Sequence, residues 1–474
     1  MSKRIVVGPF NRVEGDLEIS LDLEDGRIAA ARVNSPLFRG FEQVLVGRVP
    51  LDALVVVPRI CGICSVSQSA AAAAALADFA GIAPTPNGRL AHRLIQATEN
   101  LADHLTHFYL FFMPDFARGA YAGRPWHAAA AARFQAVKGT AAADVLPARA
   151  NFLKLMGFLA GKWPHTLALQ PGGSTRAMTA AERIRILALL RVFRTFLEET
   201  LLGDSLEAVA ALDSADALAA WAAGRGGDFP LFLAAAADLG LERTGRAEDR
   251  FLSYGAYDIF PAGAWQPGGE TQPLCPGAIS EDARHAWLAD GEPRHPAQGQ
   301  TVVAADKPDA YTWCKAPRLD GAVMEVGALA RQAAAGQPLL RDLVARHGGS
   351  VTARIAARMV ELATVVPAME QWVKELVPGD PFCAHGPFPD EGQGAGLVEA
   401  ARGSLGHWLS VKRGRIERYQ IIAPTTWNFA PRDTAGRPGA LEQALVGLPA
   451  GEGAPPTVQH VVRSFDPCMV CTVH

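Results

Sequence analysis

The sequence has few cysteines and no long hydrophobic run. Only seven of its 474 residues are cysteine, an odd number that is too sparse for a disulfide framework. The longest apolar stretches, near residues 51–57 and 108–113, are far shorter than the roughly 20 residues that span a bilayer. No basic segment followed by an apolar stretch and a cleavage site is visible, so a signal peptide is not predicted. We therefore expect a cytoplasmic protein with no membrane span.

Charge of one sign is also lacking. Forty-five basic residues stand against 48 acidic ones, and the formal net charge of −3 gives no reason to expect nucleic acid as a partner. Charged residues make up 20% of the chain and apolar residues 49%, as in ordinary globular proteins. The length exceeds that of a single hydrophobic core, so two or three subdomains are expected.

The residue periodicity predicts a mainly α-helical chain with small α+β parts at both ends. Strands are predicted at 4–7 and 17–23, followed by a turn at 24–26, and a second β-like segment covers 415–425. Helices are predicted at 67–79, 90–113, 129–161, 180–201, 205–222, 324–347 and 350–376. Segments interpreted as loops lie at 258–310, 378–396 and, around one short helix, 432–456. We accordingly divide the chain into an N-terminal segment 1–60, a helical bundle core 61–380 and a C-terminal segment 381–474.

Four of the cysteines form two Cys-x-x-Cys pairs at opposite ends of the chain. Cys61 and Cys64 stand at or just before the N-terminus of a predicted helix, where the helix dipole favours thiolate over thiol. Cys468 and Cys471 are among the last seven residues. Four thiolates that converge make a site for a soft metal, and this requires the fold to bring its ends together. The other cysteines stand singly and are interpreted as buried thiols: Cys275, Cys314 and Cys383.

A local zinc module, a redox dithiol and a disulfide each fit the two pairs less well. In local zinc modules the pairs lie roughly 15–20 residues apart, whereas several hundred residues separate them here. A redox dithiol needs one pair only, close to a strand–helix unit. A disulfide between the ends is poorly matched to a cytosolic chain. Binding of a metal by all four thiolates is the interpretation that we prefer.

Motifs along the whole chain resemble those of the large subunit of nickel–iron hydrogenases. Each motif alone is weak, but their occurrence in order is specific. The N-terminal motifs are Arg12-Val13-Glu14-Gly15, Phe38-Arg39-Gly40-Phe41-Glu42, Arg59-Ile60-Cys61-Gly62-Ile63-Cys64 and Asp103-His104-x-x-His107-Phe108-Tyr109. The later motifs are Tyr311-x-Trp313-x-Lys315-Ala316-Pro317-Arg318, Glu399-Ala400-Ala401-Arg402-Gly403, Ala423-Pro424-Thr425-Thr426-Trp427-Asn428 and Arg463-Ser464-Phe465-Asp466-Pro467-Cys468-x-x-Cys471-x-x-His474. The resemblance implies the long-helix bundle of that family.

The resemblance also implies a binuclear nickel–iron centre whose iron carries carbon monoxide and cyanide. Cys61 and Cys468 would then be terminal nickel ligands, and Cys64 and Cys471 would bridge nickel to iron. Thiolates are soft donors that suit low-valent nickel. By the same resemblance, Pro424, Thr425 and Arg402 would surround the diatomic ligands, and Thr425 would hydrogen-bond a cyanide. Asp103 and Asp466 would hold the permanently charged Arg402 guanidinium over the open site.

Two glutamates acquire roles from the same resemblance. Glu14 would accept the proton from the sulfur of Cys468, because a carboxyl in a largely apolar site has its pKa raised towards neutrality. Glu42, the backbone carbonyl of Ile421 and His474 would hold magnesium or another divalent ion. Without the resemblance, Glu14 would be interpreted as a turn residue and Glu42 as a solvated charge on a helix.

Some positions depart from the common pattern of the family. Gln68 and Asp16 stand where histidine is usual, and Ile63 and Phe111 stand where many relatives have valine and leucine. The last two would narrow the hydrophobic channel for gas, which hinders oxygen more than hydrogen. Gln68, Ile63 and Phe111 together resemble the regulatory branch, which signals hydrogen to a histidine kinase. Neutral drift at these positions is the alternative.

The implied reaction is reversible heterolytic cleavage of H2 into protons and electrons. The chain has no spare cysteine cluster, so iron–sulfur centres would belong to a small partner subunit. Maturation proteins are expected partners, because most relatives lose an extension after the residue equivalent to His474; this chain is either a matured product or a member of the branch without one. An energy-conserving uptake hydrogenase remains the alternative function, and a metal-binding scaffold without hydrogen chemistry is a third.

Overall fold

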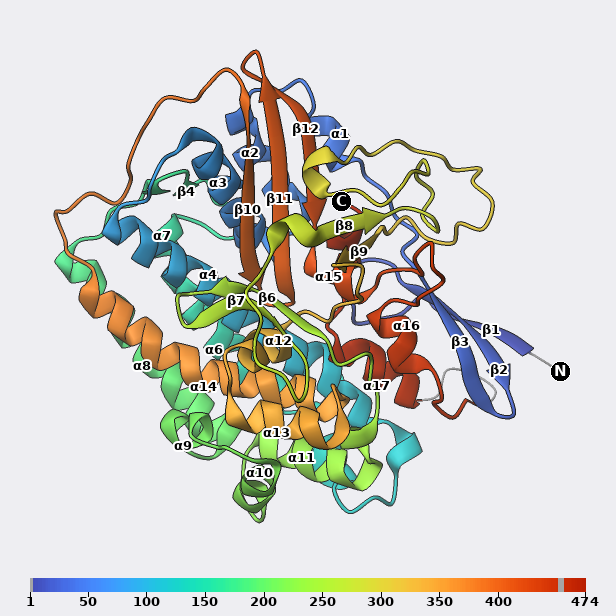
Figure 1. Ribbon diagram of the computed structural model, residues 1–474. Helices are drawn as coiled ribbons and strands as arrows, with labels where there is room; N and C mark the ends of the chain where they lie inside the picture. Colours follow the sequence, from blue (N-terminus) through green and yellow to red (C-terminus); the bar gives the residue numbers. More distant parts are fainter. Residues whose placement is uncertain (1–2, 451–455) are drawn as a thin grey trace.

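The computed structural model describes residues 3–450 and 456–474. Long helices form its centre, and small sheets lie around them (Figure 1). The longest central helices are α3 (Ser65–Ala80), α4 (Pro86–Thr106), α8 (Ala180–Phe196) and α14 (Val351–Glu375). The predicted fold class, a long-helix bundle with small α+β parts, is therefore confirmed.

Several predicted helices are interrupted. The segment 129–161 forms three helices, because the chain leaves helical geometry at 135–140 and again near Leu153. The predictions 205–222 and 324–347 each correspond to two short helices. These helices are α5 (His127–Phe134), α6 (Ala141–Phe152), α7 (Lys154–Ala160), α9 (Leu206–Ala210), α10 (Ala215–Ala222), α12 (Ala328–Ala334) and α13 (Pro338–His347). Between them lies α11 (Asp228–Leu239), which the sequence pattern missed.

The N-terminal segment forms a three-stranded antiparallel sheet. Its strands are β1 (Lys3–Val7), β2 (Glu18–Glu24) and β3 (Arg27–Asn34), and the predicted turn joins the last two. Alternate β2 residues are fully buried against the helices, as the period of two predicts. The short helices α1 (Phe41–Leu45) and α2 (Ala53–Val56) then lead through the 3-10 turn η2 (Val57–Ile60) to Cys61.

A second three-stranded sheet packs on α3 and was only partly predicted. It consists of β10 (Gly392–Ala400), β11 (Gly403–Lys412) and β12 (Arg415–Ile422), joined as antiparallel hairpins. The glycines of β10 suggested a loop, but they allow the strand to approach the alanine-rich helix. A Cβ atom on Gly394 or Gly396 would lie 2.2 Å or 2.0 Å from a carbonyl oxygen of α3. The prediction of a loop through 396 was therefore wrong.

The C-terminal segment returns to the centre through short elements. They are α15 (Pro424–Asn428), α16 (Ala440–Leu445), α17 (Pro456–Ser464) and α18 (Met469–Thr472). Residues 451–455 of the predicted linker lie outside the described residues. Short two-stranded sheets interrupt the predicted loop 258–310 and its flanks, namely β6 (Phe251–Ala256) with β7 (Phe260–Trp265) and β8 (Ile279–Asp282) with β9 (Ala316–Leu319). Another, β4 (Leu169–Gln170) with β5 (Gly173–Ser174), lies between α7 and α8.

No helix in the described ranges is both long and apolar enough to cross a membrane. The three isolated cysteines differ in burial: Cys314 is buried, Cys383 is partly buried and Cys275 is exposed. The expectation that all three are buried thiols is therefore wrong for Cys275.

Candidate metal centre

The four paired cysteines converge at one buried point. Their sulfur atoms all lie within 4.8 Å of one another. Cys61 Sγ lies 3.5 Å from Cys468 Sγ, and Cys64 Sγ lies 3.0 Å from Cys471 Sγ. Sulfurs bound to one ion at about 2.3 Å lie at most about 4.6 Å apart, and the two facing pairs, at 3.5 Å and 3.0 Å, are well within that limit. The first cysteines of the two pairs face each other, as do the second.

The N-terminal pair is fixed by helix α3. Cys64 occupies the N-cap position, and the side chain of Glu99 from α4 accepts hydrogen bonds from the backbone N–H groups of Val66 and Ser67, each at 2.9 Å. The indole of Trp163 donates to the same carboxylate at 2.9 Å. Glu99 is fully buried and satisfies N–H groups that a helix N-terminus otherwise leaves without partners.

The C-terminal pair depends on contacts with distant segments. The backbone N–H of Cys468 donates to Thr425 Oγ1 at 3.1 Å, and that of Met469 donates to the Glu14 carbonyl at 2.7 Å. Arg39 joins the two halves directly, because its Nη2 donates to the carbonyl oxygens of Ile60 and Val470 at 2.6 Å and 2.5 Å. The position of this pair is therefore set by tertiary structure.

Arg402 lies at the tip of a hairpin beside the sulfurs. Strands β10 and β11 pair up to Ala400 and Gly403, so only Ala401 and Arg402 form the turn. Arg402 Nη1 lies 2.9 Å from Asp103 Oδ2, and Nη2 lies 3.1 Å from Asp466 Oδ1. Burial lowers the pKa of Arg402, but the two carboxylates outweigh it and raise that pKa. The predicted grouping of Arg402 with both aspartates is thus present.

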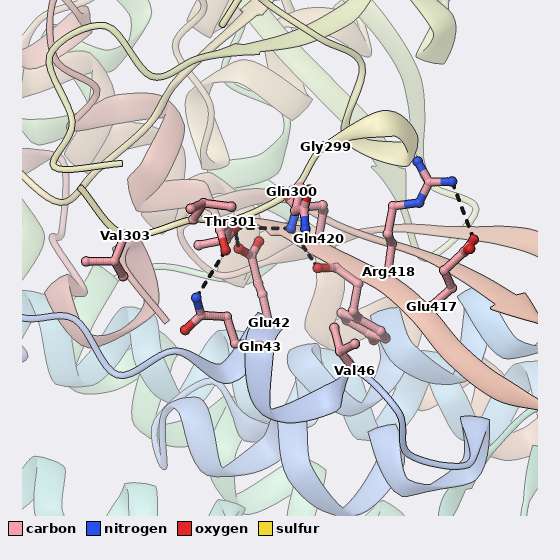
Figure 2. A pocket seen from close by; sticks show the side chains of 12 residues that line it. Glu42, Gln43, Val46, Gly299, Gln300, Thr301, Val303, Glu417, Arg418 and Gln420 are labelled. Atoms are coloured by element: carbon pink, nitrogen blue, oxygen red, sulfur yellow. Dashed lines mark hydrogen bonds and ion pairs between the residues drawn. The ribbon is translucent and has the colours of Figure 1, made fainter. Parts of the chain in front are cut away.

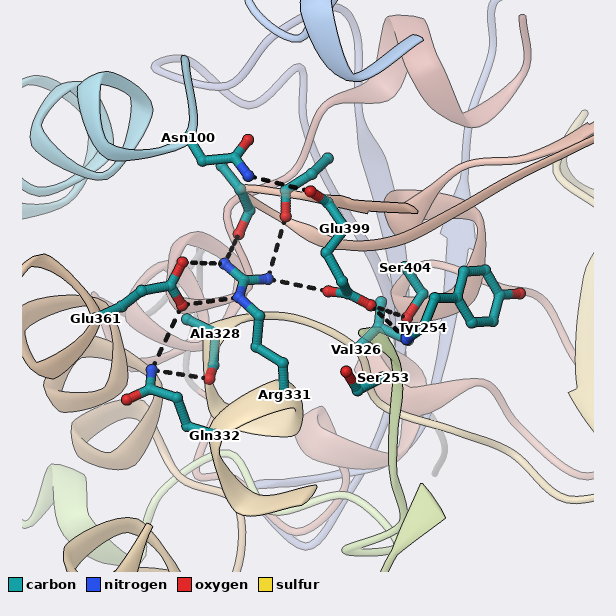
Figure 3. A network of polar contacts seen from close by, with 12 residues as sticks. Asn100, Ser253, Tyr254, Val326, Ala328, Arg331, Gln332, Glu361, Glu399 and Ser404 are labelled. Atoms are coloured by element: carbon teal, nitrogen blue, oxygen red, sulfur yellow. Dashed lines mark hydrogen bonds and ion pairs between the residues drawn. The ribbon is translucent and has the colours of Figure 1, made fainter. Parts of the chain in front are cut away.

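A second buried arginine holds the hairpin tip (Figure 3). Arg331 from α12 donates to the carbonyl oxygens of Ala400 and Ala401, each at 3.1 Å. The carboxylate of Glu361 on α14 receives two further hydrogen bonds from Arg331 at 2.7 Å, and that of Glu399 receives one at 3.1 Å. All five N–H groups of the guanidinium therefore have acceptors. This network fixes the backbone immediately before Arg402.

Glu14 pairs with the segment that carries Cys468. Its backbone N–H donates to the Pro467 carbonyl at 3.4 Å, and Glu14 and Cys468 form an isolated parallel bridge. The side chain is partly buried. Burial raises the pKa of the Glu14 carboxyl, as does negative charge on Cys61, while Arg402 and Arg39 oppose the shift. The carboxyl thus has the direction of shift that a proton acceptor at neutral pH needs.

Glu42 lines a surface pocket of about 400 Å³ (Figure 2) and also meets His474. His474 Nε2 lies 3.2 Å from Glu42 Oε1 and Lys315 Nζ lies 3.5 Å from it, while Thr301 donates to Glu42 Oε2. Burial alone would raise the pKa of Glu42, but Lys315 and His474 lower it to about 2. Ile421 contacts the carboxylate through its backbone N–H, at 2.8 Å; that its carbonyl binds a cation stays a prediction.

The residues that suggested the regulatory branch lie in different surroundings. Gln68 is fully buried on α3, and its Oε1 lies 2.8 Å from His407 Nε2. Ile63 is partly buried against the cluster of apolar residues that contains the four cysteines. Phe111 is partly exposed, and its carbonyl accepts a hydrogen bond from Arg12 at 3.2 Å. Their effect on gas access stays a prediction.

Sequence reasoning missed several residues around the centre. Arg39 and Lys315 stood within recognised motifs but had no assigned role. Glu99 precedes Asp103 by four residues, so both lie on the same face of α4, and this spacing was the available signal. Arg331 lies in an alanine-rich segment, where its burial has no local signature.

The donor set fits the predicted cluster on structural grounds. Four buried sulfurs offer soft ligands, and the buried Arg402 guanidinium, ion-paired with Asp103 and Asp466, places a positive charge near them. The centre would therefore present both thiolate ligands and a fixed cation to a bound group.

Comparison with known proteins decides the family. The family model for nickel-dependent hydrogenases matches residues 39–118 and 116–474. The chain belongs to the nickel-dependent hydrogenases. It is 30% identical to the large subunit of the periplasmic [NiFeSe] hydrogenase of Desulfomicrobium baculatum, over 99% of this chain and 95% of the relative. It is 27% identical to the hydrogenase-2 large chain of Escherichia coli K12, over 100% and 97%.

Solved hydrogenases have the same fold. The Ni-Fe-Se hydrogenase of D. vulgaris Hildenborough in its as-isolated oxidised state matches with a TM-score of 0.87 and 28% identity, and the match covers 100% of both chains. The chain thus has the architecture of hydrogenase large subunits, and the members of this family act on H2. The predictions of the family and of the fold are confirmed.

Proposed function

We propose that this hydrogenase chain is the catalytic large subunit, which cleaves H2 heterolytically at its metal centre and passes the proton on through Glu14. The observation that carries the proposal is the convergence of four buried sulfurs within 4.8 Å. Cys61, Cys64, Cys468 and Cys471 would hold nickel, and iron with carbon monoxide and cyanide ligands. When bound, this group would supply the redox centre that polarises H2 and accepts its electrons.

The residues around the sulfurs would handle the proton and the charge. Glu14 would accept the proton that arrives on Cys468, because the backbones of the two residues are paired and burial raises the pKa of the carboxyl. Arg402, held by Asp103 and Asp466, would direct a fixed positive charge into a buried site that excludes water. Thr425 already accepts the Cys468 N–H, which leaves its hydroxyl proton for a cyanide nitrogen, beside Pro424.

The decisive experiment replaces Glu14 by glutamine in the nickel-loaded protein. The variant should keep its nickel, because no sulfur is altered. Its rate of isotope exchange between D2 and water protons should fall at least tenfold. Nickel analysis and mass spectrometry of HD measure the two quantities. Undiminished exchange per nickel would exclude Glu14 as the proton acceptor.

The electrons must leave through a partner, for which we propose the small iron–sulfur subunit. Within the described residues, the four cysteines at the centre are the only group of three or more His, Cys, Asp or Glu side chains spaced for one metal. Close to this centre lies an apolar strip, defined as five side chains that are each 40–52% exposed: Val44, Val46, Val49, Leu51 and Val55. Several large apolar side chains exposed within one short segment indicate a candidate interface. Leu51→Glu with Val55→Glu should prevent co-purification of the small subunit and leave nickel content unchanged.

We further propose that Glu42, His474 and the Ile421 carbonyl hold a magnesium ion. A carboxylate kept ionised by its neighbours and a buried imidazole support a divalent cation. Lys315 is the nearest competing cation. Elemental analysis of the purified protein should find about one magnesium per chain, and Glu42→Gln should remove it.

For the physiological role we propose hydrogen sensing in the cytoplasm, with a histidine kinase as the receiving partner. Gln68, Ile63 and Phe111 support this role, whereas the 28% identity to the uptake hydrogenase large subunit of Rhodobacter capsulatus favours energy-conserving uptake. A sensor should turn over well below roughly 10 s⁻¹, the median for enzymes, and should resist oxygen.

A double variant tests the gas channel. Ile63→Val with Phe111→Leu should speed inactivation by oxygen. Inactivation kinetics identical to those of the wild type would show that these two side chains do not restrict oxygen. Maturation proteins are required in the preparation, and cell fractionation tests the location.

A further inference from the structure

A single buried carboxylate connects the two chain ends near the proton-transfer pair. Asp115 lies in the 3-10 turn η4 (Met113–Ala117) and is 1% exposed. Three arginines bind it. Arg463 Nη1 lies 2.5 Å from Oδ2, Arg118 Nη2 lies 2.6 Å from Oδ1, and Arg12 Nη2 also contacts Oδ1. Burial raises the pKa of Asp115, but Arg463 and Arg12 outweigh it and lower that pKa.

Two of these arginines belong to the segments that carry the proton-transfer residues. Arg12 precedes Glu14 by two residues, and Arg463 precedes Cys468 by five. Arg463 also donates from Nη2 to the carbonyl and to the side-chain oxygen of Asn11, each at 2.8 Å. The carboxylate of Asp115 therefore neutralises two guanidiniums that would otherwise repel each other where the chain ends meet.

The pairing of Glu14 with Cys468 is too short to hold itself in register. One backbone hydrogen bond, from Met469 to Glu14, is 2.7 Å long, and the other, from Glu14 to Pro467, is stretched to 3.4 Å. Both segments leave extended geometry at each end of this parallel bridge: Arg12 (φ 55°) and Asp466 (φ 57°) are left-handed before it, and after it Gly15 has φ 83° and Met469 begins α18. The ladder cannot extend, so anchors outside it must set the separation of the two residues.

We propose that Asp115 is a positioning residue for the proton step, because its carboxylate holds Arg12 and Arg463 together and so fixes Glu14 against Cys468. This inference rests on the proposed function of Glu14. Without the carboxylate, the three guanidiniums repel, and the two segments move apart. The four sulfurs keep their contacts through α3, Arg39 and Thr425, none of which involves Asp115.

The chain offers a matched control. Asp228, at the start of α11, is 4% exposed, and it binds Arg133 at 2.8 Å and 2.9 Å and the hydroxyl of Tyr109 at 2.7 Å. Replacing Asp228 by asparagine also breaks a buried ion pair of the helical bundle. It does not touch the segments that carry Glu14 or Cys468.

The first measurement is deuterium uptake by the backbone of the purified full chain. Asp115→Asn should raise the uptake of peptides covering 11–16 and 465–470 at least tenfold in rate, because the Met469 N–H loses its acceptor. Asp228→Asn should leave the uptake of these peptides unchanged. Unchanged uptake in Asp115→Asn, or an equal rise in both variants, would overturn the proposal.

The second measurement uses the nickel-loaded complex with its small subunit. Asp115→Asn should keep at least half of the nickel and should lower H2-dependent dye reduction per nickel about tenfold, with a larger solvent isotope effect. A fall in the amount of active protein alone would not change that isotope effect. If Asp115→Asn shows the same solvent isotope effect and the same rate per nickel as the wild type, the proposed role of Asp115 is overturned.

A further variant keeps the proposal testable if Asp115→Asn does not fold. Arg12→Gln removes one arm and leaves Asp115 paired with Arg463 and Arg118. It should raise uptake of the same two peptides and increase the isotope effect, and the absence of both changes would overturn the proposal. A wild-type complex that holds nickel but releases no protons from H2 would refute the proposed function itself, whereas the uptake result would still decide the structural link.

Discussion

The two Cys-x-x-Cys pairs have the same sequence pattern, but the structure holds them in different ways. Cys61 and Cys64 precede a helix of 16 residues, α3, whose first N–H groups bind Glu99. Cys468 is the N-cap residue of a helix of only four residues, α18, and Cys471 lies within that helix. An isolated helix of that length is unstable, so the C-terminal pair relies on distant partners such as Thr425.

This difference separates a pre-formed half of the centre from a half that docks. The N-terminal half needs α3 and α4, two long helices that pack together. The C-terminal half is held by hydrogen bonds with Arg39, Thr425 and the Glu14 carbonyl, which come from distant segments. A metal can therefore bind all four sulfurs only when the segment that carries Cys468 and Cys471 is packed in place.

The largest expected effect follows from replacing one cysteine of either pair. Cys64→Ser and Cys471→Ser should each lower nickel content at least tenfold, because a hydroxyl is a poor ligand for a soft metal. Metal analysis of the purified chain measures this effect. Cys275→Ser, which changes an exposed cysteine, is the control and should retain nickel. Loss of nickel from only one of the two variants would show that the halves do not share a centre.

The anchor of the N-terminal half should make stability depend on pH. Burial raises the pKa of Glu99 to about 7, whereas the carboxyl titrates near 4.5 in the unfolded chain. Since the folded state binds the proton more tightly, this stabilisation is complete below pH 4.5 and is lost as pH rises through 7. The free energy of unfolding should fall by about 2–3 kcal/mol between pH 5 and pH 8 through this group.

Glu99→Gln isolates this contribution. The difference in unfolding free energy between wild type and variant, measured with urea at each pH, cancels the other titrating groups. It should fall steadily as pH rises from 5 and should level off above pH 7. A difference that does not vary between pH 5 and pH 8 would mean that Glu99 titrates at its ordinary pKa.

The anchor of the C-terminal half should contribute less. Thr425→Val leaves the buried Cys468 N–H without an acceptor and should cost about 1–2 kcal/mol of unfolding free energy. Thr364→Val is the matched control: its hydroxyl bonds only the Val360 carbonyl within α14, which also accepts the helical hydrogen bond. Urea unfolding should show a cost below about 0.5 kcal/mol for the control. Equal costs would show that the Thr425 contact does not anchor the segment.

The sequence predicted this asymmetry only in part. The alanine-rich run after Cys64 predicts α3 from local propensity, and the structure extends it by only a few residues. The glycines of β10 concealed a strand, because their purpose is close contact with the backbone of Ala71 and Ala75. Contacts between segments hundreds of residues apart leave no periodicity in either one.

For the site, the resemblance supplied the residues that would bind the metal but not those that hold these residues in place. Arg402 was predicted, whereas Arg331, which binds the two carbonyl oxygens before it, has no motif of its own. Asp115 follows a predicted helix, and no local pattern distinguishes it from a solvated charge. The burial of Asp115 can be inferred only when its ion-pair partners are known, and one of them, Arg463, comes from the opposite end of the chain.

The smallest expected effect compares the second spacer residue of the two pairs. Ile63 and Val470 are both partly buried against the apolar cluster around the sulfurs. Ile63→Val should cost only about 0.5 kcal/mol, because it removes one methylene from a side chain that is not fully buried. Val470→Ile should cost about 1 kcal/mol, because Val470 packs against Gly15 so closely that a Cβ there would lie 3.0 Å from its Cγ1.

The two exchanges make valine and isoleucine change places between the halves, so side-chain volume is conserved in the double variant. If the docked half is the more tightly constrained one, the double variant should be less stable than Ile63→Val alone, and urea unfolding of all three proteins measures this. A stabilising Val470→Ile would instead show spare room beside Gly15. The C-terminal half would then be loosely packed, and its position would depend on hydrogen bonds and on the metal alone.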